Sequence, residues 1–171
     1  MHHDDAPSDD DARARITELV RDARICMLTT TDLDGRQVSR PMVLQKAEFD
    51  GDLWFFTHDH SAKIRQIRVN PQVNIAFSSP GRKAWVSVSG TAAEAWRRDR
   101  AERLWHPLLG ELFPDGPDTP GITLLKVHAG SAEYWESPGG TATSLLGYAR
   151  AVAADRRADV ADVAENRTVG Y

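Results

Sequence analysis

Apolar and polar residues alternate with a period of two along much of the chain, which is the pattern of strands that are buried on one face. The clearest example is the segment Gln72–Ser78, whose three large apolar residues all fall on the same side. Runs rich in β-branched and aromatic residues mark further strands, bounded by turn-forming residues. The strands predicted in this way are Ile25–Thr31, Gln37–Phe49, Leu53–Thr57, Gln72–Ser78, Ala84–Ala95, Ile122–Ala129 and Ser131–Trp135.

Turn signals separate these strands and suggest how they pair. Asp32–Gly35 and Asp50-Gly51 have the composition of hairpin turns, so the first three strands are expected to form an antiparallel meander. Ser79–Gly81 predicts another turn, and the last two strands are expected to join tightly near Gly130.

Helical periodicity is confined to a few segments. Ala12–Ala23 carries an apolar stripe at spacings of three and four, and a short helix begins at Ser61 and ends before Pro71. Further helices are expected over Asp99–Trp105 and Thr141–Ala154, with a loop over Phe113–Gly121 between strands.

The fold class follows from this order of elements. A parallel sheet would need a helix after each strand, and the chain lacks these helices. We therefore predict a mainly β fold with flanking helices, in the α+β class: an antiparallel Greek-key barrel of six to seven strands. The barrel domain is expected over residues 12–155, after a disordered tail over residues 1–11 and before a C-terminal tail over residues 156–171.

Charge and composition exclude several classes of function. The net charge of −4 over 171 residues gives no overall basic surface, so neither nucleic acid nor a membrane is an expected partner. The single cysteine, Cys26, cannot form an intrachain disulfide, and the N-terminal segment has no secretory pattern. We expect a cytoplasmic protein. No nucleotide-cradling glycine motif, CxxC pair or HExxH motif is present, and His58-Asp59-His60 is interpreted as a polar loop, so no metal site is predicted.

The segment Arg40-Pro41-Met42-Val43 is the first candidate for a binding site. Proline cannot donate a hydrogen bond to a strand ladder, so Pro41 places this strand at an edge or at a bulge. Backbone groups beside Pro41 are then free to face a ligand, with the cation of Arg40 nearby. A protected edge strand with a surface arginine is the alternative explanation.

The segment Phe56–Lys63 is the second candidate. A helix that begins at Ser61 presents free N–H groups and a partial positive charge, which suits a phosphate. Lys63 lies in the first turn, where a cation opposes the helix dipole unless an anion lies nearby. A Ser61 cap beside a solvated lysine is equally consistent with this segment.

Two tryptophans form the third candidate. Trp85 falls on the polar side of its strand with Ser87 and Ser89, and Trp135 poses the same question near the end of the last strand. A tryptophan on a polar face is typical of an interface or a ligand contact, although packing at the rim under a helix gives the same pattern.

Taken in order, these segments resemble the pyridoxamine 5'-phosphate oxidase-like family of FMN-binding split barrels, and in particular its general-stress-protein branch. The resemblance extends from about Ile16 to Ala154. The residues that carry it are Arg40–Val43, Asp50–Thr57, Ser61–Ile67, Asn70-Pro71, Val86–Gly90 and Glu133–Pro138.

The resemblance implies a homodimer of split barrels with FMN bound at the subunit interface. Arg40 and Lys63 would neutralise the phosphate, and Ser61 would add a hydrogen bond. The ring and ribityl contacts implied are Pro41, Met42, Val43, Phe56, Thr57 and Trp85, with Trp135 closing the site from the partner subunit.

Two departures from the oxidase pattern narrow the expected activity. Ala62 stands where the oxidase has an arginine beside the phosphate-binding lysine, so one phosphate contact is lost unless Arg65 compensates. The C-terminal arginine motif that holds pyridoxal phosphate is also absent, since Arg150 lies in a helical pattern. Vitamin B6 oxidation is therefore not expected.

Three functional hypotheses remain open from the sequence. The first is an FMN-dependent oxidoreductase with a stress-related role, in which a hydride is transferred through the flavin. The second is a non-catalytic flavin carrier or sensor, since no acid–base pair is recognisable and nothing selects among His58, His60 and His128. The third is a deazaflavin or haem cofactor on the same fold, where haem would require an axial histidine facing the cleft.

Overall fold

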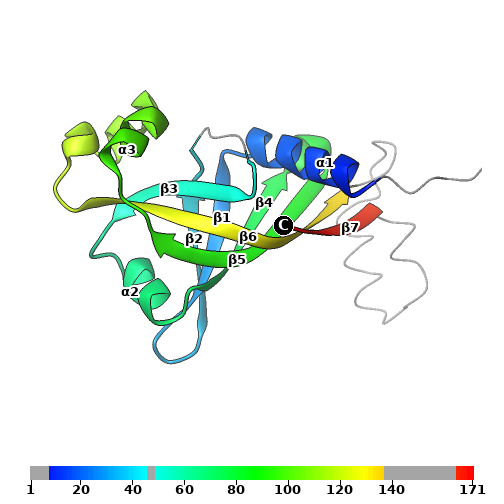
Figure 1. Cartoon of the computed structure of the whole chain (residues 1–171), viewed down its shortest axis with the longest axis horizontal. Helices are drawn as coiled ribbons and strands as arrows, with labels where there is room; N and C mark the ends of the chain where they lie inside the picture. Colours follow the sequence, from blue (N-terminus) through cyan, green and yellow to red (C-terminus); the bar gives the residue numbers. More distant parts are fainter. Residues whose placement is uncertain (1–7, 46–48, 137–164) are drawn as a thin grey trace, which may run out of the picture.

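The alternating segments form one curled antiparallel sheet, which a computed structural model describes for residues 8–45, 49–136 and 165–171 (Figure 1). Six strands follow the order β2-β1-β4-β5-β6-β3, and β7 pairs with β6. This curled half-barrel of seven strands with flanking helices confirms the predicted fold class. The strands are β1 (Ile25–Thr31), β2 (Gln37–Val43), β3 (Asp52–His58), β4 (Gln72–Ser79), β5 (Ala84–Glu94), β6 (Ile122–Glu136) and β7 (Glu165–Gly170).

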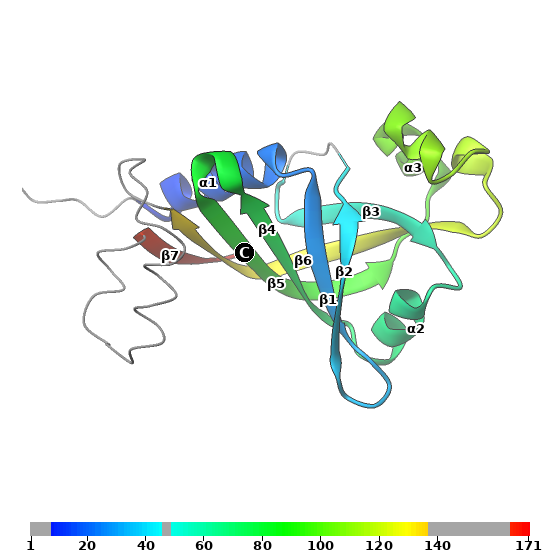
Figure 2. The same ribbon diagram turned by 180° about the vertical axis from the view of Figure 1, so that it is seen from behind.

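The helices lie around the ends of this sheet (Figures 1 and 2). None of the helices in the described part of the chain combines the length and apolar character of a membrane-spanning segment. The α-helices are α1 (Asp9–Asp22), α2 (Ala62–Val69) and α3 (Arg98–Leu104), and the short 3-10 helices are η1 (Pro80–Arg82), η2 (Pro107–Glu111) and η3 (Gly116–Asp118).

The two faces of the sheet differ as the alternation predicts. Val73, Ile75 and Phe77 of β4 point inward and are buried, as are Val86 and Val88 of β5. Together with the inner face of α1 they form the main core. Strand β3 is buried on both faces, because its other side packs under α3 and η2 in a second cluster made of Trp54, Phe56, Ala101, Leu109, Phe113 and Leu124.

Helix α1 begins at Asp9, three residues before the predicted start at Ala12. A reciprocal capping box explains the earlier start: the Ser8 hydroxyl accepts from the Asp11 N–H, and the Asp11 carboxylate accepts from the Ser8 N–H. Three acidic residues in the first turn also suit the positive end of the helix.

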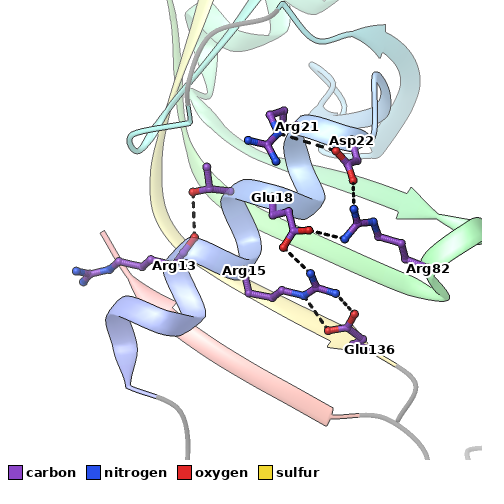
Figure 3. A network of polar contacts seen from close by, with 8 residues as sticks. Arg13, Arg15, Glu18, Arg21, Asp22, Arg82 and Glu136 are labelled. Atoms are coloured by element: carbon purple, nitrogen blue, oxygen red, sulfur yellow. Dashed lines mark hydrogen bonds and ion pairs between the residues drawn. The ribbon is translucent and has the colours of Figure 1, made fainter. Parts of the chain in front are cut away.

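A chain of ion pairs fastens α1 to the sheet (Figure 3). The Arg15 guanidinium bridges the carboxylates of Glu18 and Glu136, and Arg82 reaches both Glu18 and Asp22 at 2.6 Å. Glu136 ends β6 and Arg82 belongs to the β4–β5 turn. The network therefore joins three segments that are far apart in sequence.

This network predicts a stability difference that depends on pH. Hydrogen bonds from Arg82, and then from Arg15, lower the pKa of Glu18 below its ordinary value of 4.5. A lowered carboxylate pKa stabilises the fold above the unfolded-state value, and this stabilisation is lost as pH falls through the folded-state value. We expect Glu18→Gln to lower the free energy of unfolding at pH 7, by an amount that shrinks below about pH 4.5. Urea unfolding across this range measures it, with Glu111→Gln as an exposed control; a pH-independent difference would contradict it.

The predicted hairpin between the second and third strands is wrong. β3 pairs along its whole length with β6, and β2 ends at Val43 rather than at Phe49. Among the described residues of the two segments, one backbone hydrogen bond links them, from the Gln45 N–H to the Trp54 carbonyl. β2 and β3 are thus the two edges of the open barrel in the described part of the chain.

The predicted turn near Gly130 is also wrong, because β6 continues as one strand to Glu136. The register against β5 shifts between Ser89 and Gly90: Ser89 lies opposite Ser131, and Gly90 lies opposite Ala129. Gly130 is the extra residue of a β-bulge, which bends the strand without reversing it.

The end of the chain holds a strand that the sequence did not predict. β7 lies within the expected C-terminal tail and pairs with the end of β6. Its Val169 joins the main core, but one apolar position in a polar segment gives no recognisable alternation. The helix predicted over Thr141–Ala154 lies outside the described residues.

Candidate functional site

A cleft opens between the two edge strands of the half-barrel, at the end where α2 begins. It has a volume of about 190 Å³. It brings together six of the predicted site residues: Pro41, Met42, Val43, Phe56, Thr57 and Lys63. Its other lining residues are His58, Leu109, Leu112 and Phe113.

The β2 side of the cleft is an edge, as Pro41 predicts. β2 pairs only with β1 in the sheet, and Pro41 lies opposite Met27 in that ladder. Because β2 is an edge strand, the missing N–H of Pro41 deprives no second neighbouring strand of a hydrogen bond. The outer edge of the strand at Met42 and Val43 borders the cleft.

Arg40 is anchored beside the cleft by neutral groups alone. Its guanidinium donates to the Thr30 hydroxyl at 2.6 Å, to the Gln66 side-chain oxygen at 3.1 Å and to the Leu28 carbonyl at 3.3 Å. Burial lowers the pKa of Arg40 from its ordinary value. These contacts fix the position of the cation without cancelling its charge.

Lys63 is a second cation in the same place. Its ammonium group donates to the Thr57 hydroxyl at 2.8 Å, and burial, assisted by the charge of Arg40, lowers its pKa from 10.5. No carboxylate of the described residues pairs with either side chain. Like charges held together in a partly buried place favour an anion as their partner.

The start of α2 adds two polar atoms without partners. Ser61 is the N-cap of the helix, but its hydroxyl makes no capping hydrogen bond and is buried without a partner. The His58 Nδ1 atom is buried and unpartnered as well. Such groups are rare in folded proteins, and both atoms are therefore available to hydrogen-bond a bound molecule. Arg65, by contrast, is exposed and donates to the His60 carbonyl.

An apolar wall completes the cleft on the side of η2. Phe113 packs against Phe56 with ring centroids 6.4 Å apart, and against His58 at 5.0 Å. Leu109 is buried beside them, whereas Leu112 is 58% exposed. The sequence did not predict this wall, because nothing local indicates that the segment after Pro107 folds back over β3. The available signal was the group of apolar residues Leu108, Leu109, Leu112 and Phe113, just before the proline- and glycine-rich loop.

Trp85 and Trp135 lie away from this cleft in the same chain. They face each other across β5 and β6 in register, on the outer side of the sheet, and both are half-buried. The cleft borders the opposite end of β6, where Thr57 pairs with Thr123. Within one chain, the two tryptophans therefore form a separate pair.

A reactive thiol and a group of side chains that could hold a metal ion would be two further kinds of reactive centre among the described residues. The Cys26 thiol is buried near the Met42 carbonyl, and burial raises its pKa to about 12, so it is not a thiolate at neutral pH. Across residues 8–45, 49–136 and 165–171, no three histidine, cysteine or acidic side chains are grouped to hold a metal ion.

Comparison with known families places this site in context. A family model described as pyridoxamine 5'-phosphate oxidase like matches residues 11–159. The chain belongs to this family. The protein bli-3 of Neurospora crassa is 32% identical to this family member over 121 residues, which cover 65% of the chain. The match spans 58% of the length of bli-3.

Solved structures support the same fold. A putative general stress protein 26 from Jannaschia has a TM-score of 0.70 at 24% identity, covering 95% of this chain and 99% of that one. The general stress FMN/FAD binding protein from Xanthomonas citri has a TM-score of 0.65 at 28% identity, covering 74% of this chain and 89% of its own. A putative general stress family protein from Xanthomonas campestris is also 28% identical, with a TM-score of 0.67 and coverages of 77% and 91%.

Proposed function

We propose that this family member binds FMN in the cleft between β2, β3 and the start of α2. The observation that carries the proposal is the pair Arg40 and Lys63, which are partly buried side by side without an anionic partner among the described residues. A phosphate supplies the missing charge. The name of the Xanthomonas citri neighbour supports a flavin as its bearer.

The residues present fit each part of this cofactor. Lys63 and Arg40 would hold the phosphate, and the unpartnered Ser61 hydroxyl would donate to it beside the first N–H groups of α2. The edge strand at Met42 and Val43, with Phe56 on the facing wall, would border the ring. Ala62 is exposed and contributes no charge, and Arg65 is directed at the His60 carbonyl, so two cations carry the phosphate contact.

The proposed chemistry is that of an oxidoreductase. Bound FMN would supply a hydride acceptor and donor. The chain contributes orientation through the fixed Arg40, and exclusion of water through the wall of Phe56, Leu109 and Phe113. A flavin carrier without turnover is the alternative, and NADH- or NADPH-dependent reduction of the bound cofactor distinguishes the two.

The outer face of the sheet supports a homodimer as part of the proposal. Ile25 and Met27 of β1 are 63% and 42% exposed, and they lie in register beside Val43 and Pro41 of β2. A second copy seated on this face would reach the rim of the cleft. Because a two-fold interface uses the same patch twice, Trp85 and Trp135 would approach the cleft of the partner.

This arrangement predicts that one charge on the outer face disrupts the dimer. We expect Met27→Glu to convert a dimer into a monomer and to weaken FMN binding, because the buried carboxylate would lack a partner. Light scattering after size-exclusion chromatography measures the mass. Val69→Glu, at a 72% exposed position on α2, is the matched control. A dimeric Met27→Glu variant with unchanged FMN affinity would contradict the prediction.

The direct test of the proposed cofactor is the absorbance spectrum of the purified protein, followed by titration with FMN. Bound flavin absorbance, or saturable quenching of FMN fluorescence, is the expected result. The absence of both signals would overturn the proposal. Parallel titrations with a deazaflavin and with haemin test the alternatives, since His58 does line the cleft as a haem ligand would require.

The biological setting is a proposal of the same kind. The names of several structural neighbours as general stress proteins support a role in the stress response. The cytoplasmic location predicted from the sequence completes this picture. Loss of growth under oxidative stress in a deletion strain, restored by the cytoplasmic protein, would test both.

A further inference from the structure

A second and larger cavity lies beside the cleft, between α1 and η2. Its volume is about 610 Å³, which is within the range of small-molecule sites. Val43 and Leu109 line both the cleft and this cavity, so the two adjoin at that wall. Lys63 and Thr57 line only the cleft. The cavity therefore meets the cleft at the wall of Val43 and Leu109, and not at the end of the cleft where Lys63 would bind a phosphate.

The walls of this cavity are mostly apolar, and the rest of the lining includes two arginines and a histidine. Leu44 and Phe49 contribute side chains between β2 and β3, and Val20 contributes the buried face of α1. An occupant is therefore expected to bury an aliphatic or aromatic body here.

Arg24 is the cation in this lining whose charge is not compensated. Arg21 lies 3.9 Å from Asp22, whereas Arg24 has no hydrogen-bonded or ionic side-chain partner in the described part of the chain. Among the described residues of the lining, Asp50 is the one acidic side chain, and its carboxylate accepts from the Asp52 N–H at 3.3 Å.

His106 supplies a directed donor. Its Nδ1 atom accepts from the Leu108 N–H at 3.2 Å, so a neutral His106 carries its proton on Nε2. The lining thus offers a guanidinium and an N–H donor to an occupant with an apolar body. A carboxylate is the group that both of these donors suit.

We infer that this cavity binds an apolar small molecule carrying a carboxylate, held by Arg24 and His106. Its assignment as the substrate site of the flavin rests on the proposed function, whereas the binding of the carboxylate does not. The shared wall of Val43 and Leu109 would bring such a molecule next to the flavin cleft.

The test is calorimetric titration of the full-length protein with 2-naphthylacetate and with its neutral amide. Arg24→Gln is expected to lower the affinity for 2-naphthylacetate by about tenfold and to leave the affinity for the amide unchanged. Arg36→Gln removes an exposed arginine from the β1–β2 turn and is the matched control, expected to have no effect. Equal binding of acid and amide to the wild type, or equal losses in both variants, would overturn the inference.

A second set of measurements separates this inference from the proposed function. Lys63→Ala should leave the affinity for naphthylacetate unchanged. If Lys63→Ala lowered this affinity as much as Arg24→Gln does, the probe would bind in the flavin cleft and the inference would be overturned. If FMN fails to bind while Arg24-dependent binding of the carboxylate persists, the carboxylate site stands and the flavin proposal fails. If FMN binds and naphthylacetate does not, the inference fails alone.

Discussion

Lys63→Ala is expected to weaken FMN binding by about 10- to 150-fold, because a hydrogen bond to a charged group contributes about 1.5–3 kcal/mol. The affinity for riboflavin should stay nearly unchanged, since riboflavin lacks the phosphate that Lys63 and Arg40 would neutralise. Fluorescence titration with both ligands measures the two affinities on the same protein. The variant should remain folded, because removing Lys63 also removes its repulsion from Arg40.

The matched control for this experiment is Arg68→Ala. Arg68 lies on the same helix and carries the same charge, but it pairs with Glu94 at 2.8 Å and does not line the cleft. It therefore reports any general effect of losing one positive charge from α2. Equal losses of FMN and riboflavin affinity in Lys63→Ala would show that Lys63 does not contact the phosphate.

Gly90→Ala is expected to lower the free energy of unfolding by about 3 kcal/mol, at the upper end of the usual overpacking range. A Cβ atom at Gly90 would lie 2.9 Å from the His128 carbonyl carbon and 3.1 Å from the Ala129 Cα, and closer still to the His128 carbonyl oxygen. These are backbone atoms of the neighbouring strand at the β-bulge, so no side-chain rotation can relieve the contact. Urea or thermal unfolding measures the loss.

Gly81→Ala is the matched control for Gly90→Ala. Nothing lies within 4 Å of a Cβ atom at Gly81, and its backbone does not have a positive φ. This substitution should change stability little. If the two alanine variants were equally stable, the close approach of β5 and β6 at the bulge would not constrain the sequence.

The fold could be predicted where its signals are local. The alternation in β4 and β5, the edge position of Pro41 and the start of α2 at Ser61 each depend on a few neighbouring residues, and each is found in the structure. The pairing of β3 with β6 could not be predicted, because the two strands are separated by more than sixty residues and no short motif records that contact. β7 was missed for a local reason, because its polar sequence shows no recognisable alternation.

The candidate site divides in the same way. Arg40, Ser61 and Lys63 were predicted from their chemistry and from the family resemblance. The structure places Lys63 with Thr57 in the lining of the cleft, and Arg40 close enough to Lys63 for their charges to interact. The wall of Leu109, Leu112 and Phe113 depends on where a long connection returns, which sequence periodicity does not encode. Trp85 was predicted as a flavin contact and Trp135 as a contact from the partner subunit, and both stay predictions.

The anchoring of Arg40 has a consequence for how a ligand would be received. Thr30 and Gln66 hold the guanidinium in place before any anion arrives, so its side chain has little rotational freedom left to lose on association. Preorganisation of this kind shifts the cost of ordering from the binding step to the folding step. The positive charges of Arg40 and Lys63 repel each other, and a bound anion would offset this repulsion, so that binding would make the protein more resistant to heat.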